Sequence, residues 1–156
     1  KSILESIFVN AKIFIAEDML AAVYAASGKE PALVCILGTG SNSCYYNGEQ
    51  MEMMTASLGY ILMDEASGNY FGKKLIVDYY YQKMPKKIAE KFRNEFDLDA
   101  DHIKKNLYRA PNPNMYLATF AKFMFEFKEE KYIKKIIKKV QPRGQKPRGL
   151  SVYSNV

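Results

Sequence analysis

The sequence predicts a mixed α/β domain with its strands in the first half and its helices in the second. Residues 32–37 (ALVCIL) form a near-continuous apolar run of strand length, which is typical of a strand covered on both faces. Beyond residue 72 the apolar residues recur instead at helical spacing, in the segments 73–83, 86–96, 100–107 and 115–127. Strands followed by a run of helices indicate an α+β or α/β body with a helical insertion or cap.

The first 31 residues predict a helix, a strand and a second helix. Residues 2–10 have the apolar spacing of the end of an amphipathic helix, and residues 12–16 (KIFIA) alternate like a short strand. Residues 19–26 (MLAAVYAA) are strong helix formers, and Gly28 and Pro31 end that pattern.

A hairpin is expected next. The loop 38–42 (GTGSN) joins the strand 32–37 to a return strand at 43–47, and Asn47-Gly48 marks the following turn. Residues 57–72 (SLGYILMDEASGNYFG) are predicted to form a second, glycine-punctuated loop.

The net charge of +6 comes from the C-terminal end of the chain. Residues 129–156 hold eight basic and two acidic residues, which leaves fifteen of each (23 less 8, and 17 less 2) in the first 128. A neutral body with a basic tail argues against nucleic acid as a partner of the folded part. The lysines of residues 131–139 are interpreted as the solvated side of a helix.

Other compositional features favour a cytoplasmic protein with no membrane partner. No apolar run approaches the roughly 20 residues that span a bilayer, and no signal peptide is recognisable. Cys35 and Cys44 are the only cysteines and are expected to be buried thiols in a reducing compartment.

The expected organisation is a domain at 1–128 and a basic helix end with a disordered tail at 129–156. Within the domain, residues 12–72 carry the site-bearing strands and loops, and residues 73–128 are helical. Residues 141–156 are rich in Gly, Pro, Gln and Arg and lack an apolar period. The absence of an initial Met suggests an excerpt, and the abrupt tail suggests a truncation or frameshift.

Three short motifs carry candidate chemistry, and each has a simpler structural alternative. The glycines of the loop 38–42 allow amide groups to approach phosphate, or they form an ordinary tight turn. Asp18 either caps the helix that follows it or acts as a general base. Asp64 and Glu65 either favour the positive end of a helix dipole, bind sugar hydroxyls, or coordinate a metal–nucleotide.

Together the motifs IAEDMLAA, ILGTGSNSCYYNG and SLGYILMDEASG resemble three consecutive landmarks of one family. It is the N-acetylglucosamine kinase and BadF/BadG/BcrA/BcrD ATPase family, in the superfamily of actin and hexokinase. The resemblance covers roughly residues 10–127. The pair formed by GTGSN and a later DE(G/A)SG loop is specific, whereas either motif alone is weak.

The resemblance implies a partial actin-like ATPase (ribonuclease H-like) fold. It also implies a kinase that transfers the γ-phosphoryl group of ATP, bound with Mg²⁺, to a sugar hydroxyl of N-acetylglucosamine. Asp18 matches the catalytic base, which also touches the sugar, and ATP-binding positions fall on Gly38, Thr39 and Ser41. Sugar-binding positions fall on Gly40, Asn42, Ser57, Leu58, Gly59 and Asp64.

The chain also departs from the family pattern. Met63 and Ala66 replace glycines of the usual GDEGSG loop, which would strain any position that needs a positive φ. The first phosphate loop (DxGxT) and the adenosine motif are absent from this sequence, so the chain alone is expected to be inactive. The expected partners are an amino sugar and ATP, and a homodimer is left open.

Two alternatives remain at this stage. One is a BadF/BadG-type ATPase activator of a dehydratase or reductase, and the other is a noncatalytic remnant. The remaining aromatic residues at 79–81 and the phenylalanines at 120, 123, 125 and 127 are expected in the core or cap. His102 has no Cys or His at ligand spacing, so a surface helix position is predicted and no metal site.

Overall fold

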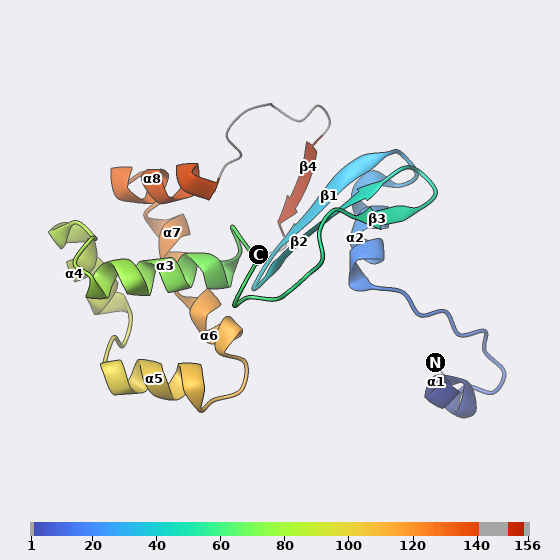
Figure 1. Ribbon diagram of the computed structural model, residues 1–156, viewed down its shortest axis with the longest axis horizontal. Coiled ribbons are helices and arrows are strands. Elements are labelled where there is room, and N and C mark those ends of the chain that lie inside the picture. Colours follow the sequence, from blue (N-terminus) through green and yellow to red (C-terminus); the bar gives the residue numbers. More distant parts are fainter. Residues whose placement is uncertain (1, 141–149, 155–156) are drawn as a thin grey trace.

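The computed structural model describes residues 2–140 and 150–154, and shows a small sheet beside a helical half (Figure 1). The sheet consists of β1 (Ala32–Leu37), β2 (Ser41–Tyr46), β3 (Met51–Met53) and β4 (Leu150–Ser154). The helices before the sheet are α1 (Ser2–Ile7) and α2 (Asp18–Ser27). The helical half comprises α3 (Gly68–Tyr80), α4 (Lys86–Glu95), α5 (Ala100–Tyr108), α6 (Pro113–Thr119), α7 (Lys122–Glu126) and α8 (Lys131–Val140).

The predicted hairpin is confirmed and lies at the centre of the sheet. The strand order is β3-β2-β1-β4, with β1 antiparallel to β2 and parallel to β4. Leu37 is opposite Ser41, so β2 begins two residues earlier than expected and the connection is Gly38-Thr39-Gly40. At the far end of β2, the Asn47 side chain accepts hydrogen bonds from the amides of Glu49 and Gln50 and forms the predicted turn.

Among the described residues, a helix covers one face of the sheet. Because side chains alternate along a strand, Val34 faces α2 together with Cys44 and Tyr46 of β2, and all three pack against Met19 and Val23. Val34 is the single fully buried residue of β1. The expectation that both faces of this strand are covered is therefore wrong: the other face lines an open pocket.

The helical half has its own core, built around aromatic rings. Phe92, Phe120 and Phe123 are buried, and the Phe92 ring contacts the rings of the other two. Phe127 is partly buried against them, as expected, whereas Phe125 is 62% exposed. The largest buried side chains of this core also include Leu75 and Ile133, from α3 and α8.

A buried carboxylate connects α3 to α8. Asp78 forms an ion pair with Lys74, one turn earlier on α3, and accepts a hydrogen bond of 2.9 Å from the Tyr132 hydroxyl. Burial, followed by the contact with Asp78, raises the pKa of Tyr132 far above its usual range. Tyr132 is therefore protonated at every physiological pH and acts as a permanent donor.

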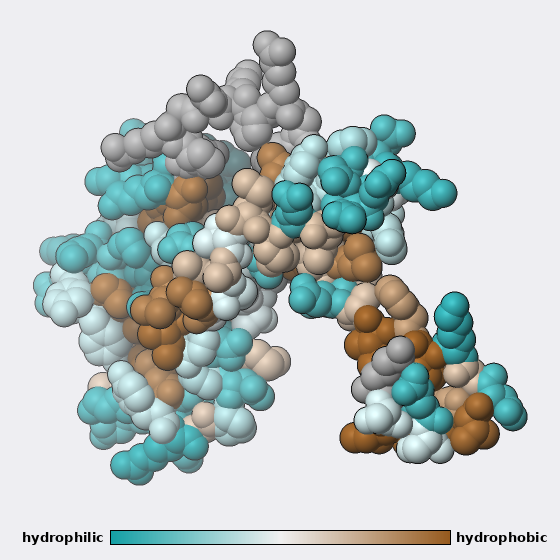
Figure 2. All heavy atoms as spheres, turned by 45° about the vertical axis from the view of Figure 1, so that its right-hand side comes forward, coloured by the Kyte–Doolittle hydropathy of each residue, from teal (hydrophilic) through white to brown (hydrophobic). Residues whose placement is uncertain are grey.

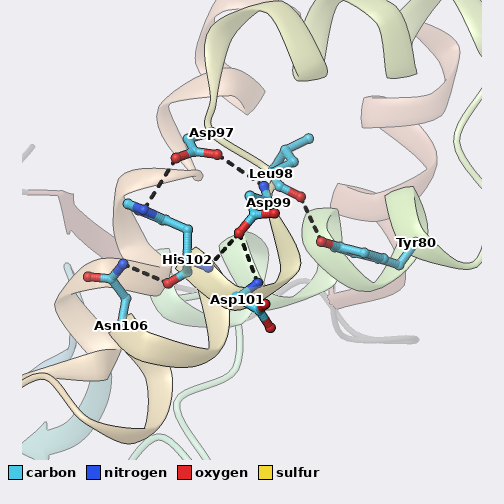
Figure 3. Close-up of polar contacts among 7 residues, drawn as sticks. All are labelled: Tyr80, Asp97, Leu98, Asp99, Asp101, His102 and Asn106. Atoms are coloured by element: carbon cyan, nitrogen blue, oxygen red, sulfur yellow. Dashed lines mark hydrogen bonds and ion pairs between the residues drawn. The ribbon is translucent and has the colours of Figure 1, made fainter.

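Helix α5 begins with a side-chain cap, which Figure 3 shows together with the surroundings of His102. The Asp99 carboxylate accepts from the amides of Asp101 and His102, which satisfies two donors of the first turn. His102 lies 3.2 Å from the Asp97 carboxylate and is exposed. The prediction of a surface helix position for His102 is confirmed.

Residues 12–16 are not a strand, contrary to the sequence-based prediction. Among the described residues no strand pairs with them, and Phe14 is 81% exposed. A β-prone pattern forms a strand only when its backbone finds a partner and its side chains find a surface, and here β4 occupies the free edge of β1. Figure 2 shows apolar side chains gathered on this projecting N-terminal segment, where α1 has no buried residue.

Three further boundaries differ from the predictions. The loop expected to reach residue 72 ends at Ser67, which caps α3 through its hydroxyl, and the helix expected at 115–127 is divided into α6 and α7. In the expected disordered tail, residues 150–154 (LSVYS) form β4, because a β-prone segment can pair with the open edge of β1. The prediction for residues 141–149 and 155–156 lies outside the described residues.

Candidate functional site

An open pocket of about 410 Å³ lies on the face of the sheet that α2 does not cover. It forms between the β1–β2 hairpin and the segment 55–65. Its lining is mostly small and polar: Cys35, Leu37, Ser41, Asn42, Ser43, Thr55, Ala56, Ser57, Leu62, Met63, Asp64 and Glu65. Four of the predicted site residues, namely Ser41, Asn42, Ser57 and Asp64, are in this set.

The hairpin loop 38–40 is attached to the first turn of α3. The amide of Gly68 donates to the Gly38 carbonyl (2.7 Å), and the amide of Asn69 donates to the Thr39 carbonyl (3.1 Å). These two amides belong to the first residues of α3, which have no acceptor within the helix itself. The loop therefore satisfies the helix N-terminus, and the helix holds the loop.

This attachment sets the direction of the amides in the loop. In a trans peptide the N–H points away from the C=O of the same unit. Since the carbonyls of Gly38 and Thr39 point at α3, the N–H groups of Thr39 and Gly40 point away from it. Neither N–H donates to another residue in the part of the chain that the structure describes. These two amides are thus available to an anionic ligand.

Gly40 is required by the close approach of Asp64. A Cβ atom at Gly40 would lie 2.8 Å from Asp64 Oδ2, so any other residue would displace the carboxylate. Nearby, the Ser41 hydroxyl donates to the Glu65 carbonyl at 2.8 Å. The loop 38–42 and the loop 64–67 consequently pack together as one unit. From the sequence, only the family resemblance connected these two loops.

Of the two residues that replace family glycines in the second loop, one has a left-handed backbone conformation. Ala66 has φ 63°, whereas Met63 does not have a positive φ. Asp64 is also left-handed, with φ 69°, which aspartate tolerates better than most residues. The expected strain is therefore present at Ala66 and absent at Met63.

Six predicted site residues are outside the pocket lining. Three of them, Gly38, Thr39 and Gly40, form the adjacent hairpin loop. Leu58 and Gly59 are also outside the lining, and Leu58 is exposed. Asp18 is exposed at the first position of α2, the helix that covers the opposite face of the sheet. The N-cap position belongs to Glu17, whose side chain makes no cap bond, so Asp18 is not the N-cap.

Sequence reasoning missed Asn69, which is 1% exposed and lies between the two loops. Its Nδ2 group lies 2.7 Å from the Thr39 carbonyl and 2.9 Å from Ser67 Oγ. The sequence holds a weak signal, since an Asn within the first turn of a helix has a side chain that favours local hydrogen bonds. Its contact with Thr39, thirty residues earlier in the chain, depends on the tertiary fold.

The two cysteines lie on opposite faces of the sheet. Cys44 is buried against α2, while Cys35 is half-buried and lines the pocket. Burial raises the pKa of both thiols; at Cys44 the nearby Cys35 adds to the rise and a backbone hydrogen bond from Val34 opposes it. Both are free thiols, and their placement is unlike a pair of ligands for one cluster.

Comparison with solved structures places the chain in a class: it has part of the actin-like fold of the sugar kinases. It matches the "Putative N-acetylglucosamine Kinase" of Porphyromonas gingivalis with a TM-score of 0.80 and 34% identity, over 89% of this chain and 50% of that one. The "Putative N-acetylglucosamine Kinase" of Chromobacterium violaceum matches with a TM-score of 0.65 and 18% identity, over 88% of this chain and 50% of that one, and this likeness shows the fold alone.

The resemblance inferred from the three motifs is therefore confirmed at the level of structure. The chain spans about half the length of the two solved structures that it matches. No protein-family profile and no curated protein sequence matches it.

The described residues are 2–140 and 150–154. They include no group of three or more His, Cys, Asp or Glu side chains placed to hold a metal ion. No helix among them has the length and apolar character needed to cross a bilayer.

Proposed function

We propose that the chain supplies the sugar-binding loops and one phosphate-binding loop of an ATP-dependent amino-sugar kinase that acts on N-acetylglucosamine. The observation that carries this proposal is the packing of the loops 38–42 and 64–67 into one unit beside a polar pocket. Such packing fixes the distance between a phosphate site and a sugar site, and phosphoryl transfer depends mainly on that positioning.

The chemistry of the pocket fits a neutral polyhydroxylated ligand. Its lining offers hydroxyl groups from four Ser and Thr residues, the side-chain amide of Asn42, and the carboxylates of Asp64 and Glu65. It contains no Lys or Arg among the described lining residues, and two carboxylates would repel a bound phosphate. Leu37, Leu62 and Met63 add apolar area suited to a sugar ring face or an acetyl methyl group.

The nucleotide phosphates fit the adjacent loop better than the pocket. The outward amides of Thr39 and Gly40 and the Thr39 hydroxyl form a small set of donors of the kind that binds phosphate. ATP, with Mg²⁺ on its phosphate oxygens, would supply the transferred phosphoryl group. Ser41 sits between the two sites but its hydroxyl is already committed to the Glu65 carbonyl.

The role of Asp18 as general base stays a prediction that rests on the resemblance. The described residues do not bring its carboxylate to the pocket. The alternative of an ATPase activator with a cysteine-bound cluster is not favoured by the placement of Cys35 and Cys44 on opposite faces.

The sugar half of the proposal can be tested on the 156-residue chain itself. N-acetylglucosamine titrated into ¹⁵N-labelled protein should shift the amide resonances of residues 35–43 and 55–65 and leave those of α4, α5 and α8 unchanged. The Asp64→Asn variant should lose this response, whereas Asp101→Asn, an exposed carboxylate on α5, should retain it. Shifts confined to other regions, or none at all, would contradict the assignment of the pocket.

The nucleotide half predicts weak or absent ATP binding by this chain, because the donors present are only one loop of a clamp. Calorimetry that revealed micromolar binding, about −8 kcal/mol, would show a more complete nucleotide site. Catalysis is tested on a full-length protein that includes the DxGxT loop and an adenosine motif, assayed for ATP-dependent phosphorylation of a panel of amino sugars.

A further inference from the structure

Asn69 is the second residue of α3 and is almost completely buried at the junction of the two loops. It contacts the hairpin loop twice, since both its backbone amide (3.1 Å) and its side-chain Nδ2 (2.7 Å) donate to the Thr39 carbonyl. The same Nδ2 group lies 2.9 Å from Ser67 Oγ and 3.4 Å from Asp64 Oδ2. One side-chain amide thus reaches acceptors on both loops.

The chemistry at this point favours a hydrogen-bond donor. The Thr39 carbonyl and the Asp64 carboxylate are both acceptors, and they face a common buried position. The Thr39 carbonyl also accepts from the Asn69 backbone amide, so Nδ2 is its second donor, and the Asp64 carboxylate is partly buried at the edge of the pocket. Removal of a donor from partly buried acceptors is costly, and more so for a carboxylate than for a carbonyl. The amide –NH₂ group has two hydrogens for three nearby acceptors: the Thr39 carbonyl and Ser67 Oγ are the nearer two, and Asp64 Oδ2 is the third. A Ser hydroxyl has one hydrogen to donate and Ala has none.

We propose that Asn69 is a positioning residue: it holds the carboxylate of Asp64 in register with the loop 38–40. This inference rests on the proposed function, in which Asp64 binds the sugar and the loop binds phosphate. Asn69 touches neither ligand. It acts by tying the carbonyl side of Thr39 and the carboxylate of Asp64 to the same rigid helix turn, so that the two binding sites move together.

The first test measures the coupling of the loops and needs no ligand. In Asn69→Ala and Asn69→Asp, the amides of Gly68 and Ser67, which donate to the Gly38 and Asp64 carbonyls, should exchange hydrogen at least about tenfold faster than in the wild type. Amides in the core of α4 and α8 should keep their wild-type rates. The aspartate variant replaces the donor with a third acceptor and should show the larger change.

Asn106→Asp is the matched control. Asn106 is also a helical asparagine whose Nδ2 donates to a backbone carbonyl, that of His102 (2.9 Å; Figure 3), but it is only partly buried and is not in the pocket lining. The same chemical change there should leave the exchange of Gly68 and Ser67 unaltered. If Asn106→Asp accelerated them equally, the effect would be general destabilisation and the inference would be wrong.

The second test measures N-acetylglucosamine binding by the same variants. Asn69→Ala should raise the dissociation constant for the sugar about tenfold while Asn106→Asp leaves it unchanged. Wild-type affinity in Asn69→Ala, or wild-type exchange at Gly68 and Ser67, would overturn the positioning role. Should the wild-type chain bind no sugar, the proposed function fails, and the exchange measurements still decide whether Asn69 joins the two loops.

Discussion

Substitution of Gly72 by alanine is expected to destabilise the protein, although alanine favours helices. Gly72 lies in the first half of α3, at the point where α3 packs very closely against α6. A Cβ atom at this position would lie 1.7 Å from the Leu117 carbonyl oxygen and 2.7 Å from its carbon. Real Cβ atoms do not approach within 3.0 Å, so α3 and α6 would have to separate by about 1.3 Å.

The magnitude follows from two opposing effects. Overpacking against rigid backbone lowers the free energy of unfolding by about 3 kcal/mol or more. The higher helix propensity of alanine relative to glycine raises it by about 1 kcal/mol. The net loss in the free energy of unfolding is about 2 kcal/mol, equivalent to a fall in the thermal midpoint of about 4–8 °C for a chain of this size. The clash is with a carbonyl group of the backbone, so side-chain rotation cannot relieve it.

Thermal unfolding followed by circular dichroism measures this change. Gly38→Ala is the control, because a Cβ atom there meets no atom within 4 Å and the backbone φ is not positive. Its midpoint should lie close to that of the wild type. A Gly72→Ala variant as stable as the wild type, or more stable, would refute the close packing of α3 on α6.

Three further substitutions test separate features. Ala66→Gly should raise the free energy of unfolding by about 1 kcal/mol, because Ala66 is left-handed (φ 63°) and glycine adopts that conformation without strain; an unchanged thermal midpoint would contradict this. Tyr132→Phe should lower the unfolding free energy by about 1–2 kcal/mol, since the buried Asp78 loses a donor, whereas Tyr81→Phe, on a side chain 71% exposed, should have little effect in the same urea titration. In a full-length kinase, Asp18→Asn should slow phosphoryl transfer about 10²- to 10⁴-fold with ATP affinity unchanged, and normal turnover would show that Asp18 is not the base.

Local patterns determined most of the secondary structure. The apolar run of β1 was located to the residue, and α2, α4 and α5 were predicted within one or two residues. These elements follow from short-range chemistry, namely apolar periodicity, helix propensity and the breaks at Gly28, Pro31 and Pro85. The three motifs in order also indicated the sugar-kinase class, which the structural neighbours support.

Contacts between distant segments decided the remainder. Residues 12–16 have a strand-like pattern but pair with no strand in the described part of the chain. Gly72 was expected in a loop but lies within α3, and the close approach of the Leu117 carbonyl explains why this position has no side chain. The same holds for the site: the sequence indicated Thr39 and Asp64, but only the fold shows that the buried Asn69 amide reaches both. Hydrogen bonds between residues thirty positions apart depend on how the two segments pack in space, and local sequence patterns do not determine that packing.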